Sequence, residues 1–225
     1  MNSMKSIFTG SMLGLGLVLA AGQPAHALQA VWDGAYTQVG SHYAEWNIFS
    51  DNNPGVVGIQ DNTPEVSHIG GGAYQVAEMT AGAFITSGGN IYSPTVPTVF
   101  NVSASSLGAG TSDVYLRVGS LGNFDTTLGQ SFTNFTLNGI GGTYTQLFNE
   151  ALGPGQGTEV EALVSWLGVT HTGSLNLAFN AIGTSVSLDQ LSLDVAAVPV
   201  PAAVYLMGSG LAGIAAMARR RQRAV

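Results

Sequence analysis

The sequence predicts an all-β protein, an antiparallel β-sandwich of jelly-roll type, flanked by an N-terminal signal peptide and a C-terminal transmembrane helix. Apolar and polar residues alternate with a period of two through the middle of the chain, as in strands with one buried face. Clusters of Asn, Asp, Gly and Pro interrupt this pattern at short intervals. Both ends are apolar and carry five of the six basic residues. The chain therefore divides into a signal peptide (1–27), a sandwich domain (28–197) and a C-terminal signal (198–225).

Residues 1–27 have the three parts of a secretory signal peptide. Lys5 supplies the positive start, residues 12–21 are apolar except for small glycines, and Ala25-His26-Ala27 offers a small-x-small cleavage site. Cleavage after Ala27 predicts an exported protein and Sec-type export machinery as a partner. The alternative is that the apolar run forms a first core helix.

The composition excludes several classes of protein. The chain has 225 residues and no cysteine, which rules out disulfide scaffolds, thiolate metal sites and cysteine nucleophiles. Its formal net charge is -7, but residues 28–198 hold all thirteen acids and a single base, Arg117, and so carry -12. A nucleic-acid-binding protein needs a basic face, so we expect no nucleic acid partner.

The strand candidates of the central domain are short. The alternation is clearest in three runs, Val114 to Val118, Val160 to Val164 and Leu175 to Phe179. Turn-forming clusters lie at 51–55, 62–64, 87–90 and 153–157. Roughly ten to twelve strands at this spacing suit a sandwich of two sheets. Residues 146–152 fit either a short helix or a strand.

The last strand candidate contains a change of phase. Val186 and Leu188 share one phase of the alternation, whereas Leu191 and the apolar residues after it share the other. The pair Asp189-Gln190 must therefore absorb one extra residue, which predicts a β-bulge. The segment from Ser187 to Leu193 also resembles the closing strand of carbohydrate-binding jelly rolls.

The C-terminal segment has the pattern of a membrane span. Residues 202–218 form an uncharged apolar run of 17 residues. At about 1.5 Å per residue a helix of this length comes just short of crossing the bilayer core. An arginine cluster follows at once, which predicts a cytoplasmic tail and an exported body. The cluster consists of Arg219, Arg220, Arg221 and Arg223.

The order of features in this tail resembles the PEP-CTERM sorting signal. A proline motif comes first, then the apolar helix, then the arginine cluster. The motif residues are Val198, Pro199, Val200, Pro201 and Ala202. The commonest form of the signal has glutamate where this chain has Val200, so the chain is more similar to the V-P-x-P-A variant.

The resemblance implies a partner and a destination. It implies an exosortase, a membrane-embedded transpeptidase-like cysteine protease, as the enzyme that recognises and processes the tail. The protein is then expected to pass through an inner-membrane intermediate and to reach the cell surface or the extracellular polymeric matrix, as biofilm proteins do. The alternative is an ordinary single-span anchor.

Two sets of residues are candidates for binding a ligand. Asp51, Asn53 and Asp61 supply oxygen ligands in a loop rich in Asn, Pro and Gly, which predicts a structural calcium ion. Trp32 and Trp46 lie in an early aromatic cluster, for which we expect packing in the core of the first strands, with a polysaccharide-binding face as the alternative.

Residues with catalytic potential are few. Glu159 and Glu161 would share one face of a strand, as paired carboxylates of a glycosidase do, but we expect a solvated face with no basic partner nearby. His42, His68 and His171 could hold a metal only if the fold brings them together. The sequence therefore predicts a non-enzymatic exported protein, with a polysaccharide-binding module as the alternative and a glycan hydrolase ranked last.

Overall fold

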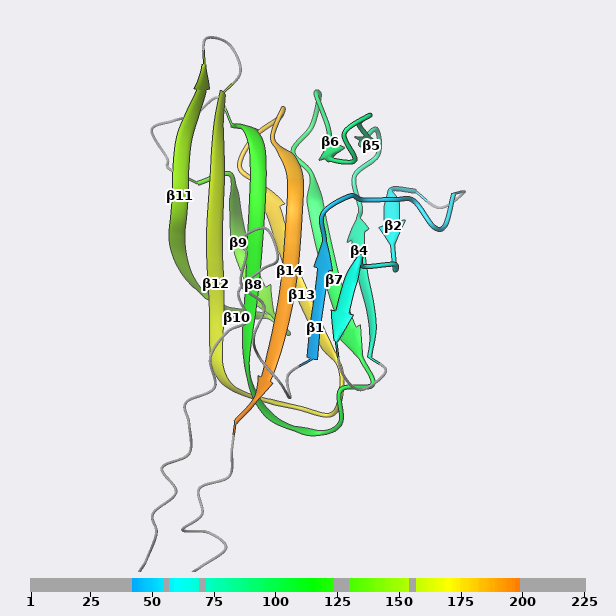
Figure 1. Ribbon diagram of the computed structural model, residues 1–225, viewed down its shortest axis with the longest axis vertical. Helices are drawn as coiled ribbons and strands as arrows, with labels where there is room; N and C mark the ends of the chain where they lie inside the picture. Colours follow the sequence, from blue (N-terminus) through cyan, green and yellow to red (C-terminus); the bar gives the residue numbers. More distant parts are fainter. Residues whose placement is uncertain (1–41, 55–56, 69–71, 124–129, 154–156, 199–225) are drawn as a thin grey trace, which may run out of the picture. The chain divides into compact units, whose positions relative to one another are not determined.

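The structure, a computed structural model, describes residues 42–54, 57–68, 72–123, 130–153 and 157–198 (Figure 1). These residues form strands and loops only, and every strand pairing among them is antiparallel. The all-β prediction is confirmed for this part of the chain. No helix in it is long and apolar enough to cross a membrane. The predicted signal peptide, Trp32 and the tail from Pro199 onward lie outside the described residues.

Two sheets make up the domain, and Figure 1 shows them as two layers. The eight-stranded sheet has the order β11-β12-β8-β14-β1-β3, with β6 paired to β14 and β5 paired to β6. Its strands are β11 (Thr143–Gly153), β12 (Gly157–His171), β8 (Gly110–Asn123), β14 (Ser187–Ala197), β1 (His42–Trp46), β3 (Val66–His68), β6 (Ile91–Tyr92) and β5 (Phe84–Ile85). The six-stranded sheet consists, in order, of β10 (Ile140–Gly141), β9 (Phe132–Leu137), β13 (Leu175–Ala181), β7 (Val99–Ser105), β4 (Ala73–Glu78) and β2 (Ile59–Asp61).

The alternation read from the sequence sets which face of each strand is buried. In β12 every second residue from Thr158 to Trp166 is buried and the residues between them are partly exposed. The apolar phases predicted for β8 and β13 are buried as well, so these half-buried strands are confirmed. Apolar residues from both sheets meet in one core cluster.

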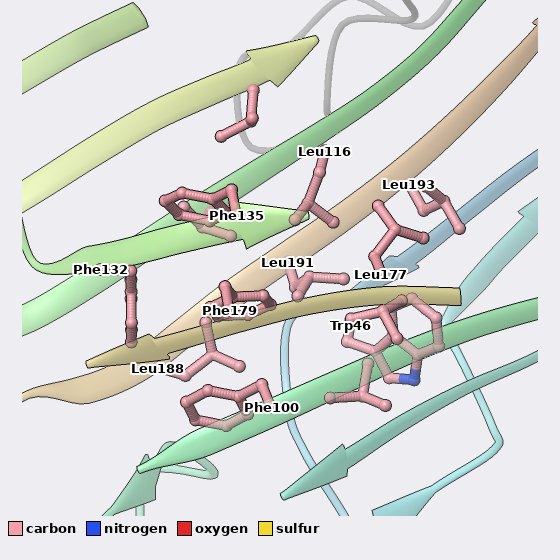
Figure 2. Packing of buried hydrophobic residues seen from close by; sticks show 14 of the residues in the cluster. Trp46, Phe100, Leu116, Phe132, Phe135, Leu177, Phe179, Leu188, Leu191 and Leu193 are labelled. Atoms are coloured by element: carbon pink, nitrogen blue, oxygen red, sulfur yellow. The ribbon is translucent and has the colours of Figure 1, made fainter. Parts of the chain in front are cut away.

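A group of phenylalanines fills one part of that core (Figure 2). Phe179 on β13 stacks on Phe100 with ring centroids 5.0 Å apart and on Phe135 at 5.2 Å. Phe132 meets Phe179 edge to face at 5.3 Å. Offset-stacked and edge-to-face contacts are the favourable arrangements for aromatic rings, so Phe179 is the centre of a well-packed aromatic cluster.

The predicted bulge in the last strand is present. Leu188 pairs with Ser120 and Gln190 pairs with Gly119, so Asp189 is an extra residue opposite β8. Residues 146–152, for which helix and strand were both open, belong to strand β11.

The described part of the chain contains fourteen strands, more than the predicted ten to twelve. Five of the fourteen are strands of only two or three residues, namely β2, β3, β5, β6 and β10. A two-residue period cannot be recognised over so few positions, because a strand of two residues shows each face once.

Candidate functional site

The predicted calcium loop is organised around the buried carboxylate of Asp61. One of its oxygens, Oδ2, accepts hydrogen bonds from the backbone N–H of Ser50 at 2.7 Å and from the Ser50 hydroxyl at 3.3 Å. The other, Oδ1, accepts from the N–H of Thr63 at 2.9 Å and from its hydroxyl at 3.0 Å. Oδ2 therefore fastens the loop after β1 to the end of β2, and Oδ1 holds the turn that follows β2.

Asp51 and Asn53 lie in the same loop and meet at Gln60. Asp51 Oδ1 accepts from the N–H of Asn53 at 3.1 Å and from that of Gln60 at 3.3 Å, and Asn53 Nδ2 donates to Gln60 Oε1 at 3.0 Å. Protein donors thus engage both aspartates. Within the described ranges no group of three or more His, Asp or Glu side chains is arranged to hold a metal ion. The calcium ion remains a prediction.

A second buried carboxylate, Glu78 at the end of β4, is less well satisfied than Asp61. Glu78 Oε1 accepts from the N–H of Thr80 at 2.7 Å, but Oε2 has no hydrogen-bond partner among the described residues. Burial raises the pKa of Glu78 above its ordinary value of 4.5, although the hydrogen bond from Thr80 partly opposes this shift.

We expect Glu78→Gln to stabilise the protein at neutral pH by about 1 kcal/mol. Because the folded-state pKa is raised, the ionised carboxylate destabilises the fold above that pKa, and this penalty disappears as the pH falls toward 4.5. The gain should therefore be present at pH 7 and absent at pH 4. Thermal unfolding at the two pH values measures it.

Asp61→Asn is the matched control, because Asp61 is equally buried but has both oxygens engaged. The NH₂ group of asparagine is a donor and would face the N–H and O–H donors that now bond the carboxylate. The free energy of unfolding of this variant should therefore fall by about 1–3 kcal/mol. Equal changes in stability for the two substitutions would show that the two carboxylates do not differ in how well their oxygens are hydrogen-bonded.

Trp46 belongs to the core and not to a binding face. Its side chain is 0% exposed and packs in the cluster between the sheets (Figure 2). A buried ring has no face open to a sugar, so Trp46 packs in the core and offers no polysaccharide-binding face. Tyr43 and Phe49, which are close to Trp46 in the sequence, are buried too.

The pair Glu159 and Glu161 lies on the outer face of β12, as two residues of one phase must. The expected solvated face without a basic partner is wrong, because Arg117 on the neighbouring β8 forms an ion pair with Glu161. The side chains of Arg117 and Glu161 are only 11% and 16% exposed. Strand pairing was needed to find this contact, since the two residues are 44 positions apart.

Further acids surround this ion pair. Glu150 on β11 stands directly opposite Glu159, and Asp189 is the extra residue of the β14 bulge. Burial raises the pKa of Glu159, and the negative charges of Glu161, Asp189 and Glu150 add to the shift. Burial likewise raises the pKa of Asp189, against a hydrogen bond with Asn90.

Of the three histidines, His171 lies close enough to His42 for their charges to interact. His171 Nδ1 accepts from the N–H of Gly173 at 3.3 Å, which assigns the ring proton to Nε2 and makes it the donor to Ser112 Oγ at 3.0 Å. Burial lowers the pKa of His171, and the nearby charge of His42 lowers it further. His68 lies on β3, with its backbone opposite Tyr43. In this pair of Ser112 and His171, a backbone N–H occupies the place where a catalytic triad has a carboxylate.

A surface groove that the sequence did not predict lies beside the β9–β10 hairpin. It has a volume of about 560 Å³. Its lining consists of Asn138, Ile140, Gly141, Thr143, Ser165, Trp166, Leu167, Gly168, Val169 and Thr170. The Asn138-Gly139 dipeptide, a strong hairpin signal, was the one clue to it in the sequence.

The proline motif begins at Val198, the last described residue of the domain. Ala25, Ala27 and the arginine cluster lie outside the described residues. Comparisons with protein-family models, with curated proteins and with solved structures found no match.

Proposed function

We propose that this chain is a non-enzymatic exported protein that an exosortase processes and that resides on the cell surface or in the extracellular polymeric matrix. The observation that carries the proposal is the ordered tail of proline motif, apolar run and arginine cluster in residues 198–225. The N-terminal pattern of a signal peptide, with Ala25 and Ala27 at the cleavage site, gives the export step.

The end of the folded domain is compatible with removal of the tail. Strand β14 ends at Ala197, and the N–H of Val198 donates to the carbonyl of Thr111 at 3.0 Å. The last described strand therefore ends just before the motif starts. Cleavage beyond Val198 would leave every described strand in place.

The chain path supports a jelly-roll type of sandwich. From β7 onward the chain passes back and forth between the sheets, with β7, β9 and β13 in the six-stranded sheet and β8, β12 and β14 in the other. Such alternation between two sheets is typical of jelly rolls and related Greek-key sandwiches.

Contacts of the polar groups support a non-enzymatic role. Glu161 is ion-paired with Arg117, and both ring nitrogens of His171 are hydrogen-bonded. These groups stabilise the pairing of β8 with β12. Binding of a polysaccharide is the second candidate function, and the uncharged groove is the observation that favours it.

Substitution of the two prolines of the motif tests the proposal. If an exosortase recognises the motif, the double variant Pro199→Ala/Pro201→Ala should remain in the membrane fraction with its tail intact. The wild-type chain should lose its tail and leave the membrane fraction with a smaller mass. Pro64→Ala is the control, because Pro64 lies in a loop of the domain and should not affect processing. Release of the double variant with its tail removed, as in the wild-type chain, would contradict the proposal.

A further inference from the structure

We infer that the groove beside the β9–β10 hairpin is a binding site for an uncharged polysaccharide. This inference does not depend on processing of the tail. The volume of about 560 Å³ lies within the range of roughly 300–1,000 Å³ that is usual for ligand clefts.

One wall of the groove is built by an irregularity in β12. Trp166 pairs with Val114 and Val169 with Ser112, so Leu167 and Gly168 together face the single residue Asp113. Gly168 has a φ of 66°, a left-handed conformation that suits glycine, and its N–H donates to Asp113 Oδ1 at 2.7 Å. The bulge leaves the Leu167 side chain 69% exposed at the rim.

The opposite wall is the tight turn between β9 and β10. Asn138 and Gly139 have φ angles of 49° and 83°, as the two central residues of a type I′ turn require. Two hydrogen bonds with the backbone of Asn176 hold Asn138 in place. The Asn138 N–H donates to the carbonyl of Asn176 at 2.8 Å, and Asn138 Oδ1 accepts from the N–H of Asn176 at 3.1 Å. Ile140, the next residue of the hairpin, is 60% exposed.

The floor connects the two walls. The indole Nε1 of Trp166 donates to the carbonyl of Ile140 at 2.9 Å, which ties the hairpin of one sheet to β12 of the other. Gly142 lies so close that a Cβ there would come within 2.6 Å of the Trp166 ring. The groove is therefore held in shape by the fold before any ligand binds, which reduces the entropy lost on binding.

The chemistry of the lining selects the class of ligand. None of the ten lining residues is charged, although the surrounding region 28–198 carries -12. An anionic polymer would be repelled by that charge and would find no basic side chain in the groove. The groove therefore suits a ligand without charge.

The lining combines polar and apolar groups, as a site for sugars requires. Leu167, Ile140 and Val169 offer apolar surface for the C–H faces of a pyranose ring, and the hydroxyl and amide groups of Thr143, Ser165, Thr170 and Asn138 can bond its hydroxyls. A purely apolar peptide or lipid would leave these polar groups without partners.

Binding of defined polysaccharides to the full-length chain tests the inference. The chain is kept in a polyoxyethylene detergent, because glycoside detergents would compete for the groove. Dextran, galactomannan, xyloglucan and laminarin are the neutral probes and alginate is the anionic one. We expect affinity electrophoresis to show retardation by at least one neutral probe and none by alginate.

Two substitutions in the groove should weaken binding without unfolding the domain. Leu167→Asp places a charge on the exposed rim, and Thr143→Val removes a hydroxyl at nearly constant volume. We expect Leu167→Asp to weaken binding at least about tenfold, and Thr143→Val a few-fold. Val99→Asp is the control, because Val99 is also an exposed apolar residue but lies on β7 away from the groove.

Several results would overturn the inference. The inference is wrong if the chain binds none of the neutral probes, or if it binds alginate as well as it binds a neutral probe. It is also wrong if the Leu167→Asp variant binds a neutral probe as well as the wild-type chain does. A dimer that Leu167→Asp converts to a monomer, with no glycan bound, would show a contact between copies of the chain instead. The processed mass and surface location are measured separately, so failure here leaves the proposed export and processing untouched.

Discussion

Phe179→Ala should lower the free energy of unfolding by about 4 kcal/mol, the loss typical of a buried phenylalanine. Phe179 is fully buried on β13, which lies between β9 and β7, and its ring contacts those of Phe100, Phe132 and Phe135. Truncation removes these contacts and leaves a cavity that the surrounding strands cannot fill without losing their register. Urea denaturation followed by tryptophan fluorescence measures the loss.

Val99→Ala on the neighbouring strand β7 is the control for Phe179→Ala. The Val99 side chain is 45% exposed, so its truncation should change stability by less than about 0.5 kcal/mol. A loss below about 1.5 kcal/mol for Phe179→Ala would mean that the aromatic cluster does not pack as described.

Arg117→Ala should lower stability by about 3 kcal/mol at neutral pH, because it leaves a largely buried negative charge uncompensated. Arg117 is the one base between residues 28 and 198, and its partner Glu161 lies close to the further acids Glu159 and Asp189. The pKa values of Glu159 and Asp189 are raised, so these groups take up protons first as the pH falls, and the loss should then shrink.

The double variant Arg117→Ala/Glu161→Gln separates the charge from the packing of the arginine stem. If uncompensated charge causes the loss, the double variant should recover more than half of it at pH 7. Thermal or chemical unfolding of the four members of the cycle gives the coupling energy. An equal loss in the single and double variants would show that the Arg117 stem, not its charge, is what matters.

Local features of the strands could be predicted from the sequence, because the alternation of side chains is a property of neighbouring residues. The buried phases of β8, β12 and β13 and the bulge at Asp189 were found in this way. The order of the strands could not, because it depends on contacts between residues far apart in the chain. The ion pair of Arg117 with Glu161 follows from that order and was missed for the same reason.

The candidate sites show a similar division. The sequence identified Asp51, Asn53 and Asp61 as one cluster. Asp51 and Asn53 lie in the loop after β1, and Asp61, the last residue of β2, is hydrogen-bonded to that loop through Ser50. It could not distinguish a core tryptophan from an exposed one at Trp46, since both fit the end of a strand next to a turn. The groove was missed because it joins a hairpin of one sheet to a bulge of the other.

The mass of the protein isolated from the cell surface or the extracellular matrix tests the central claim most directly. Removal of the signal peptide after Ala27 and of the tail by an exosortase predicts a species that begins at Leu28 and lacks residues 202–225. Intact-mass spectrometry, with peptide mapping of both ends, identifies that species. A surface form that still ends at Val225 would contradict the account and would make the tail an ordinary membrane anchor.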